Sequence, residues 1–221
     1  PAAPAPRAAT PRVRIGVARD VAFQFYYEEN LALLRAAGAE LVSWSPETAS
    51  EVPDVDGLYL GGGYPELRAA ALSANAHVRH GVRKLVEAGR PVYAECGGLM
   101  YLADTLEDDA GLAHEMAGVL PATVRMRPRR LSLAYTTVTT VAPSLLGPAG
   151  TVVRGHEFHY STLSEPPSSV PRVYHVTDTR GRARAEGYQL GHALLSYVHL
   201  HFGSHPAVAT AFVDACARRA A

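Results

Sequence analysis

Short apolar runs alternate with helix-like patterns in the first half of the chain. The predicted helices are residues 26–37 and 76–88, whose apolar positions recur at helical spacing and which end at Gly38 and Gly89 as C-caps. The predicted strands, each short and mostly apolar, are residues 13–18, 40–44, 57–60 and 91–94. Successive strands joined through helices form crossover connections, so this half of the chain predicts a parallel sheet flanked by helices.

From about residue 115 the pattern becomes β-rich, with Gly and Pro turns between strands. We therefore expect a single α/β domain, with a parallel core first and an antiparallel extension in the C-terminal half. Residues 1–11 have no hydrophobic period and are interpreted as a linker or frayed end, which makes residues 12–221 a domain of a longer protein. The predicted C-terminal strands are residues 119–126, 131–141, 152–160, 172–176 and 186–190, and the closing helix is residues 206–219.

Composition and charge exclude several classes of protein. The 221 residues include 21 Lys and Arg and 21 Asp and Glu, so the formal net charge is zero and no basic excess is available for nucleic acid. No stretch approaches the roughly 20 apolar residues that span a bilayer, and residues 1–11 lack the apolar segment of a signal peptide. Cys96 and Cys216 form neither a disulfide framework nor a zinc pattern. We expect a reduced, cytoplasmic protein that binds neither nucleic acid nor membrane.

The stretch PVYAECGGLMY, residues 91–101, places Cys96 between an apolar strand and an apolar helix pattern. This arrangement is typical of a nucleophile elbow, in which a sharp turn lifts the nucleophile above the sheet edge. Gly97 and Gly98 leave room for the turn, and the helix N-terminus is expected to favour the thiolate of Cys96. Most free cysteines are small buried hydrophobes, and we apply that interpretation to Cys216, which lies among alanines of the terminal helix.

A cysteine nucleophile needs a base, and histidine is the usual one. The ten histidines include two clusters, in GHEFHY (155–160) and SYVHLHF (196–202). If these segments are strands, His199 and His201 point the same way, because alternate residues of a strand share a face. A zinc site is the competing interpretation, but no HExxH helix or cysteine pair completes one, so we expect no metal ligands.

A glycine run follows another predicted strand, in GLYLGGGYP (57–65). At the carboxyl end of a strand, Gly61 to Gly63 can offer N–H groups to an anionic or tetrahedral oxygen, or form a plain turn before a helix. The run is not a GxxxxGK[ST] phosphate loop, because Lys84 is the only lysine of the chain and lies outside such a motif. We therefore expect no nucleotide cofactor on this chain.

Four segments in this order resemble the glutaminase domain of cobyrinate or hydrogenobyrinate a,c-diamide synthases: GLYLGGGYPE (57–66), YAECGGLMY (93–101), RGHEFHYS (154–161) and SYVHLHF (196–202). That domain is a class I glutamine amidotransferase domain, and the resemblance extends over residues 13–215. It implies an α/β fold with a flavodoxin-like parallel sheet flanked by helices. It also implies an activity in cobalamin biosynthesis, in which glutamine supplies ammonia through a thioester intermediate.

The resemblance also implies roles for single residues. Cys96 matches the nucleophile that attacks the side-chain amide of glutamine, and His199 matches the histidine that activates the thiol and protonates the departing ammonia. Gly62 and Gly63, with the backbone N–H of Gly97, match the oxyanion-binding and substrate-binding positions. The implied partners are glutamine and an ATP- and Mg²⁺-dependent synthetase domain, expected outside this chain, that amidates the a and c carboxylates of the corrin ring. A homodimer stays open.

One departure leaves the third member of the catalytic triad unassigned. Many class I glutaminases carry a His-x-Glu pair whose Glu orients the histidine, but here the residue two after His199 is His201. Two alternatives also stay open: a glutaminase serving another synthetase, such as nickel-sirohydrochlorin or cell-wall amidation, and a catalytically silent docking domain. The segments that contain His156 and His199 favour the diamide synthase branch, and the presence of Cys96 with His199 disfavours a silent domain.

Overall fold

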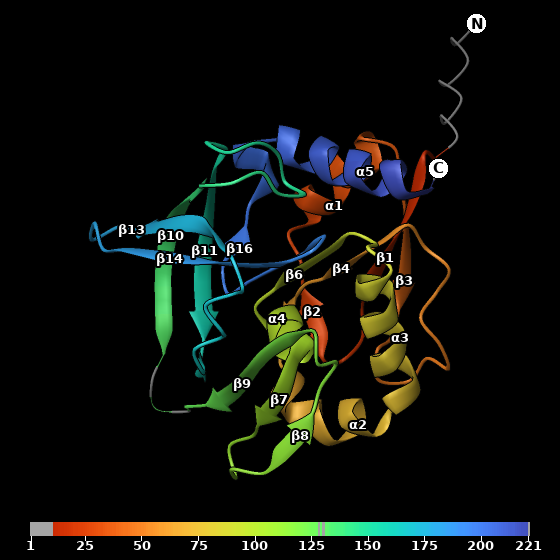
Figure 1. Cartoon of the computed structure of the whole chain (residues 1–221), viewed down its shortest axis with the longest axis vertical. Helices are drawn as coiled ribbons and strands as arrows, with labels where there is room; N and C mark the ends of the chain where they lie inside the picture. Colours follow the sequence, from red (N-terminus) through yellow and green to blue (C-terminus); the bar gives the residue numbers. More distant parts are fainter. Residues whose placement is uncertain (1–10, 128, 130, 221) are drawn as a thin grey trace, which may run out of the picture.

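The computed structural model describes residues 11–127, 129 and 131–220, which fold around a ten-stranded mixed sheet (Figure 1). The predicted linker, residues 1–11, lies almost wholly outside the described residues. Along the sheet the strands follow the order β16-β11-β10-β13-β14-β15-β6-β4-β1-β3. The sheet has a parallel half, from β15 to β3, and an antiparallel half, from β16 to β14.

The five parallel strands lie in the order β3-β1-β4-β6-β15. Numbered along the chain, this is the 2-1-3-4-5 order of flavodoxin-like sheets, as predicted. β4, β6 and β15 are buried at every position, because both faces of this half are covered. The bounds are β1 (Val13–Ala18), β3 (Ala39–Trp44), β4 (Gly57–Leu60), β6 (Val92–Glu95) and β15 (Ala193–Ser196).

Helices pack on both faces of the parallel half (Figure 1). The two predicted helices in the first half of the chain end as expected, before Gly38 (φ 104°) and Gly89 (φ 75°) in the left-handed region. One face carries α1 (Glu28–Ala36) and α5 (Ala207–Ala220), and the other carries α2 (Ala69–Ala74), α3 (Ala76–Glu87) and α4 (Gly97–Leu102).

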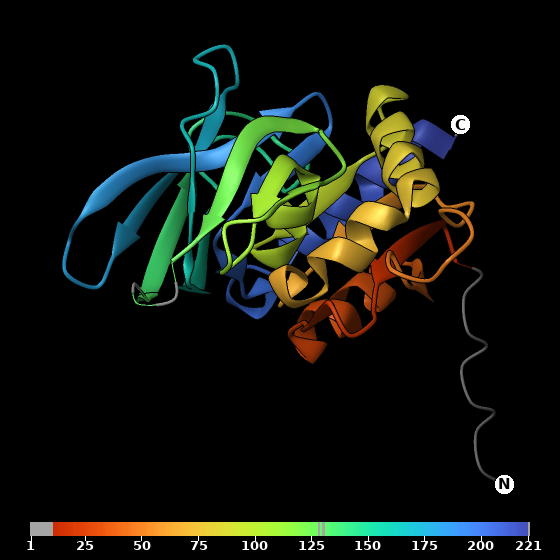
Figure 2. The same ribbon diagram turned by 90° about the horizontal axis from the view of Figure 1, so that it is seen from below.

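The antiparallel half extends away from the helices (Figure 2). It consists of β10 (Ser132–Thr140), β11 (Val152–His159), β13 (Arg172–Asp178), β14 (Ala183–Leu190) and the short β16 (His199–Leu200). The predicted chain order needs one correction: β15, the fifth parallel strand, follows the extension. Its pairing with β6 joins segments far apart in the sequence, which local patterns do not reveal.

Smaller elements complete the edge of the sheet where the parallel strands end. A second sheet follows α4, and a two-stranded ribbon of β2 and β5 brings the glycine run against the segment before α1. The second sheet contains β7 (Ala103–Glu107), β8 (Ala113–Glu115), β9 (Leu120–Met126) and β12 (Ser161–Leu163). The remaining elements are β2 (Phe23–Phe25), β5 (Gly62–Gly63) and the 3₁₀ turns η1 (Pro65–Arg68) and η2 (Phe202–Ser204).

Candidate active site

Cys96 lies in the turn between β6 and α4, with φ 48° and ψ −101°. Among the described residues it is the only non-glycine residue with a positive φ. A backbone conformation of this kind costs about 1–3 kcal/mol and persists only where the surroundings impose it. Here the Cys96 N–H donates to Ser196 O on β15 (2.7 Å), and the Met100 N–H donates to Cys96 O (2.9 Å). The predicted elbow is therefore present and is held by the neighbouring parallel strand.

The two glycines after Cys96 let the elbow pack tightly against the end of β4. A Cβ added at Gly98 would lie 2.3 Å from the carbonyl oxygen of Leu60, and one added at Gly97 would lie 3.1 Å from the backbone nitrogen of Gly63. The Gly98 N–H also donates to Gly61 O (2.9 Å). Gly97 and the glycine run, which the sequence placed in one oxyanion-binding group, thus lie in direct contact.

His199 is 3% exposed and approaches the glycine run from the opposite half of the sheet. A Cβ added at Gly62 would lie only 2.3 Å from Cε1 of its imidazole. The ring stacks on His156, with centroids 4.8 Å apart, and Phe25 packs edge-on against it, also at 4.8 Å. Its Nδ1 is buried without a hydrogen-bond partner in the described part of the chain. Packing, and not a carboxylate, therefore orients this imidazole.

His201, the nearest rival to His199, has a different role in the structure. β16 ends at Leu200, and His201 directly precedes η2, with its Nε2 3.0 Å from the Glu29 carboxylate. The Tyr27 ring packs edge-on against His201, and the Tyr27 hydroxyl is 2.7 Å from His156 Nδ1. His201 therefore does not line the pocket that contains Cys96 and His199.

A buried carboxylate, Glu95, joins the nucleophile strand to the histidine strand. It is 1% exposed and accepts hydrogen bonds from the Tyr93 hydroxyl (2.5 Å), the Tyr59 hydroxyl (2.8 Å) and the backbone N–H of Leu200 (2.8 Å). Leu200 is the neighbour of His199, and Glu95 is the neighbour of Cys96, so one side chain sets the spacing of the two segments. No sequence motif indicates this role of Glu95, although a charged residue at the end of an apolar strand is the available signal.

Asn30 on α1 is a second positioning residue. Its amide donates to Leu200 O and its carbonyl accepts from the Phe202 N–H, both at 2.7 Å. These bonds fix the backbone on either side of His201, and no sequence motif indicates them.

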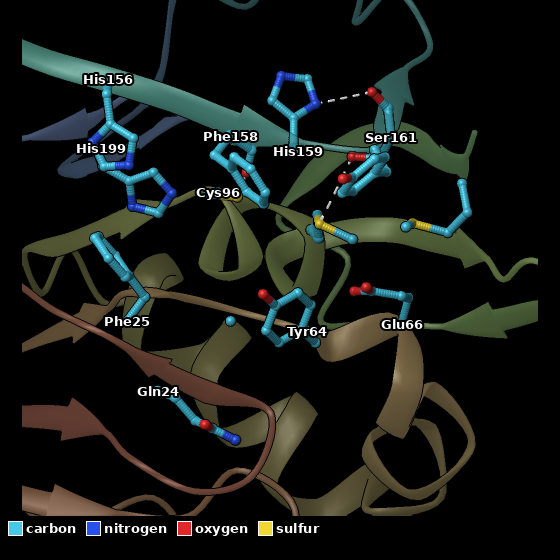
Figure 3. A pocket seen from close by; sticks show the side chains of 14 residues that line it. Gln24, Phe25, Tyr64, Glu66, Cys96, His156, Phe158, His159, Ser161 and His199 are labelled. Carbon is cyan, nitrogen blue, oxygen red and sulfur yellow. Dashed lines mark hydrogen bonds between the residues drawn. The ribbon is translucent and has the colours of Figure 1, made fainter. Parts of the chain in front are cut away.

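A pocket of about 560 Å³ opens at the elbow (Figure 3). In this view Cys96 lies between His199 on one side and Glu66 on the other. Aromatic and methionine side chains form much of the wall, together with polar groups that include Gln24 and His159. The complete lining is Gln24, Phe25, Gly63, Tyr64, Glu66, Cys96, Met100, Met126, His156, Phe158, His159, Tyr160, Ser161 and His199.

Burial keeps the thiol and the imidazole neutral. It raises the pKa of Cys96 to about 12, and the nearby Glu66 carboxylate adds to this shift, while the Gly97 N–H opposes it. Burial also lowers the pKa of His199 to about 3, with contributions from His156 and His159. The Cys96 thiol accordingly donates to the carbonyl oxygen of Phe158 (3.7 Å). The expected thiolate is thus not the state of the free site, because desolvation outweighs the N–H groups at the start of α4.

Cys216 is fully buried in α5, as expected. No group of three His, Cys, Asp or Glu side chains that could hold a metal ion occurs in residues 11–127, 129 and 131–220. Over the same residues, every helix is too short or too polar to cross a membrane.

The 2-1-3-4-5 parallel sheet with helices on both faces places this chain in the fold class of the glutamine amidotransferases. Solved structures support this class at the level of the fold. PurLQS from Thermotoga maritima aligns with a TM-score of 0.65 at 13% identity, over 93% of this chain and 99% of that chain. A structure described as a glutamine amidotransferase aligns with a TM-score of 0.62 at 18% identity, over 91% of this chain and 98% of that one.

Within this class, the chain belongs to the CobB/CobQ-like glutamine amidotransferase domain family, whose model matches residues 14–207. Among its curated relatives, the cobyrinate a,c-diamide synthase of Syntrophotalea carbinolica is 48% identical over 92% of this chain and 45% of the relative. The one from Priestia megaterium is 42% identical over 93% of this chain and 45% of the relative. The resemblance noted in the sequence is confirmed, and the chain spans less than half the length of these relatives.

Proposed function

We propose that this chain hydrolyses glutamine at Cys96 and His199 and that the ammonia serves the amidation of the a and c carboxylates of cobyrinate or hydrogenobyrinate. The observation that carries this proposal is the strained elbow of Cys96, which shares a pocket with a buried, neutral histidine. A strained non-glycine residue in the lining of a pocket supports a catalytic role, because strain of this kind is concentrated at functional sites.

The proposed reaction begins with the neutral Cys–His pair. As the Cys96 sulfur attacks the amide carbon of glutamine, its proton passes to the His199 imidazole and the carbonyl oxygen becomes an oxyanion. His199 then returns the proton to the amide nitrogen, the C–N bond breaks, and ammonia leaves a γ-glutamyl thioester on Cys96. Water attacks the thioester with His199 as the base, which releases glutamate and restores the thiol.

The proposed oxyanion site lies at Gly62, Gly63 and the N–H of Gly97. The contact between Gly97 and Gly63 and the placement of Gly63 in the pocket lining support this role. Loss of one such donor typically costs about 3 kcal/mol of transition-state stabilisation. The N–H of Gly61 is not a candidate, because it donates to the Tyr26 hydroxyl (2.9 Å).

The relatives support the acceptor half of the proposed reaction. Their name, cobyrinate a,c-diamide synthase, and the length they have beyond this chain support a synthetase domain as the user of the ammonia. We place the ATP and Mg²⁺ requirement on that domain. The same names favour the corrinoid over the nickel-sirohydrochlorin and cell-wall alternatives.

The test is a glutaminase assay on the chain alone and with its synthetase domain supplied in trans, following glutamate release. We expect Cys96→Ala to lose hydrolysis entirely, because no thioester can form, while circular dichroism and melting temperature stay close to those of the unaltered chain. Cys216→Ala is the matched control, since that cysteine is buried in α5 away from the pocket. Glutamate release by a folded Cys96→Ala protein would refute the mechanism.

A further inference from the structure

Glu66 is the one carboxylate among the described residues that line the pocket, and that lining includes no lysine or arginine. It lies on η1, directly after the glycine run, and its side chain points to the pocket from the side of Cys96 opposite His199 (Figure 3). Within the described residues, its only hydrogen bond is to its own backbone N–H. A half-buried carboxylate whose only hydrogen bond is to its own residue is incompletely solvated, so a ligand cation at this position would be stabilised.

The reacting part of glutamine and its charged part are well separated. Two methylene groups lie between the amide carbon, which must reach the Cys96 sulfur, and the Cα atom that bears the ammonium group. We propose that Glu66 binds the α-ammonium of the substrate and thereby makes the site specific for free glutamine. This inference rests on the proposed glutaminase function and adds the residue that recognises the amino acid end of the substrate.

The position of Glu66 has a second consequence for the thiol. After burial, the negative charge of Glu66 is the largest contribution that raises the pKa of Cys96, and burial with Asp109 nearby raises the pKa of Glu66 itself to about 7. An ammonium group bound to Glu66 neutralises this charge. Substrate binding therefore favours sulfur deprotonation at the moment when the amide carbon is in place, and an empty pocket keeps the thiol protonated.

The experiment compares glutamine with glutaramate, which is glutamine without its α-amino group. For the unaltered chain we expect a kcat/KM for glutamine on the order of 10- to 100-fold above that for glutaramate, which is the range of a hydrogen bond to a charged group. Glu66→Gln should reduce this ratio to within about threefold of unity by raising the KM for glutamine. Glu66→Asp keeps the charge but withdraws it by one methylene, and should retain part of the ratio.

Asp109→Asn is the matched control, because it removes a nearby exposed carboxylate that does not line the pocket. Because Asp109 raises the pKa of Glu66, its removal leaves Glu66 more fully ionised, and the ratio should stay at least as large as in the unaltered chain. Binding of both compounds to Cys96→Ser, measured by calorimetry with and without Glu66→Gln, must show the same discrimination in a protein that cannot turn over. As an independent readout, iodoacetamide should alkylate Cys96 faster in Glu66→Gln than in the unaltered chain, because the thiol loses its negative neighbour.

The outcomes separate the two proposals. If the unaltered chain hydrolyses glutamine but Glu66→Gln keeps the full ratio in kinetics and in binding, the role of Glu66 is wrong and the glutaminase function stands. If the unaltered chain neither hydrolyses nor binds glutamine, with or without its synthetase domain, both proposals are wrong.

Discussion

Gly62→Ala tests whether the position of the His199 ring beside the glycine run limits catalysis. The added Cβ would lie 2.3 Å from Cε1 of His199 and 3.3 Å from each ring nitrogen, whereas an ordinary contact is 3.4–4 Å. The imidazole must therefore withdraw by about 1 Å, but the His156 stack and the Phe25 edge enclose it on other sides. A displacement of this size can cost about 100-fold in rate. We expect that loss in kcat, with a small change in KM.

The backbone of Gly62 does not have a positive φ, so alanine is compatible with its conformation and the fold should survive. Gly203→Ala is the matched control, because its Cβ would meet Glu29 at 2.4 Å, a flexible side chain that is 56% exposed and can move. The assay is steady-state glutamate release, paired with melting temperature. A Gly62→Ala protein with activity within about threefold of the unaltered chain would show that the position of the His199 ring does not limit catalysis.

Two further predictions concern protonation and cofactors. His156→Phe keeps the ring stack but removes a group that lowers the pKa of His199, so the pKa of His199 should rise and the acidic limb of the kcat/KM profile should move to higher pH. His77→Phe, on the exposed face of α3, is the control. An acidic limb that does not move in His156→Phe would contradict the coupling between the two histidines. Calorimetry should detect no Mg-ATP binding to this chain, because its only lysine, Lys84, is exposed within α3 and lies outside any phosphate loop. Micromolar binding of Mg-ATP would reveal a nucleotide site of another kind.

Local patterns predicted the elements that are determined locally. The bounds of β1 and β4 follow directly from apolar runs between turn residues, and the elbow follows from a cysteine and two glycines after a buried strand. The patterns did not predict β15 as the fifth parallel strand, because its assignment depends on pairing with β6 across the whole antiparallel extension. In the same way, the Glu95 bond to Leu200 joins residues 105 positions apart and has no sequence signature.

The protonation state of Cys96 shows a different limit of sequence reasoning. A cysteine that begins a helix is expected to have a lowered pKa, and that expectation considers only nearest neighbours. The pKa depends on all surrounding atoms, and here the sheet, the glycine run and β11 enclose the sulfur, while Glu66 adds a negative charge. Desolvation of this extent can be determined only after the fold has brought those segments together.

Orientation and activation are separate in this site. Glu95 and Asn30 fix the backbone beside His199 through Leu200, and the His156 stack fixes the ring, so the geometry is present before any ligand binds. The charged forms of Cys96 and His199 are not present before a ligand binds, because burial holds both groups neutral and makes proton transfer between them unfavourable. The Gly97 N–H only partly opposes this effect, and further stabilisation of the charged pair comes from groups that arrive with the substrate or form during the reaction, which are the α-ammonium proposed to bind Glu66 and the oxyanion. We therefore expect slow hydrolysis by the chain alone and faster hydrolysis when the proposed synthetase domain shifts the site toward an arrangement that stabilises the oxyanion.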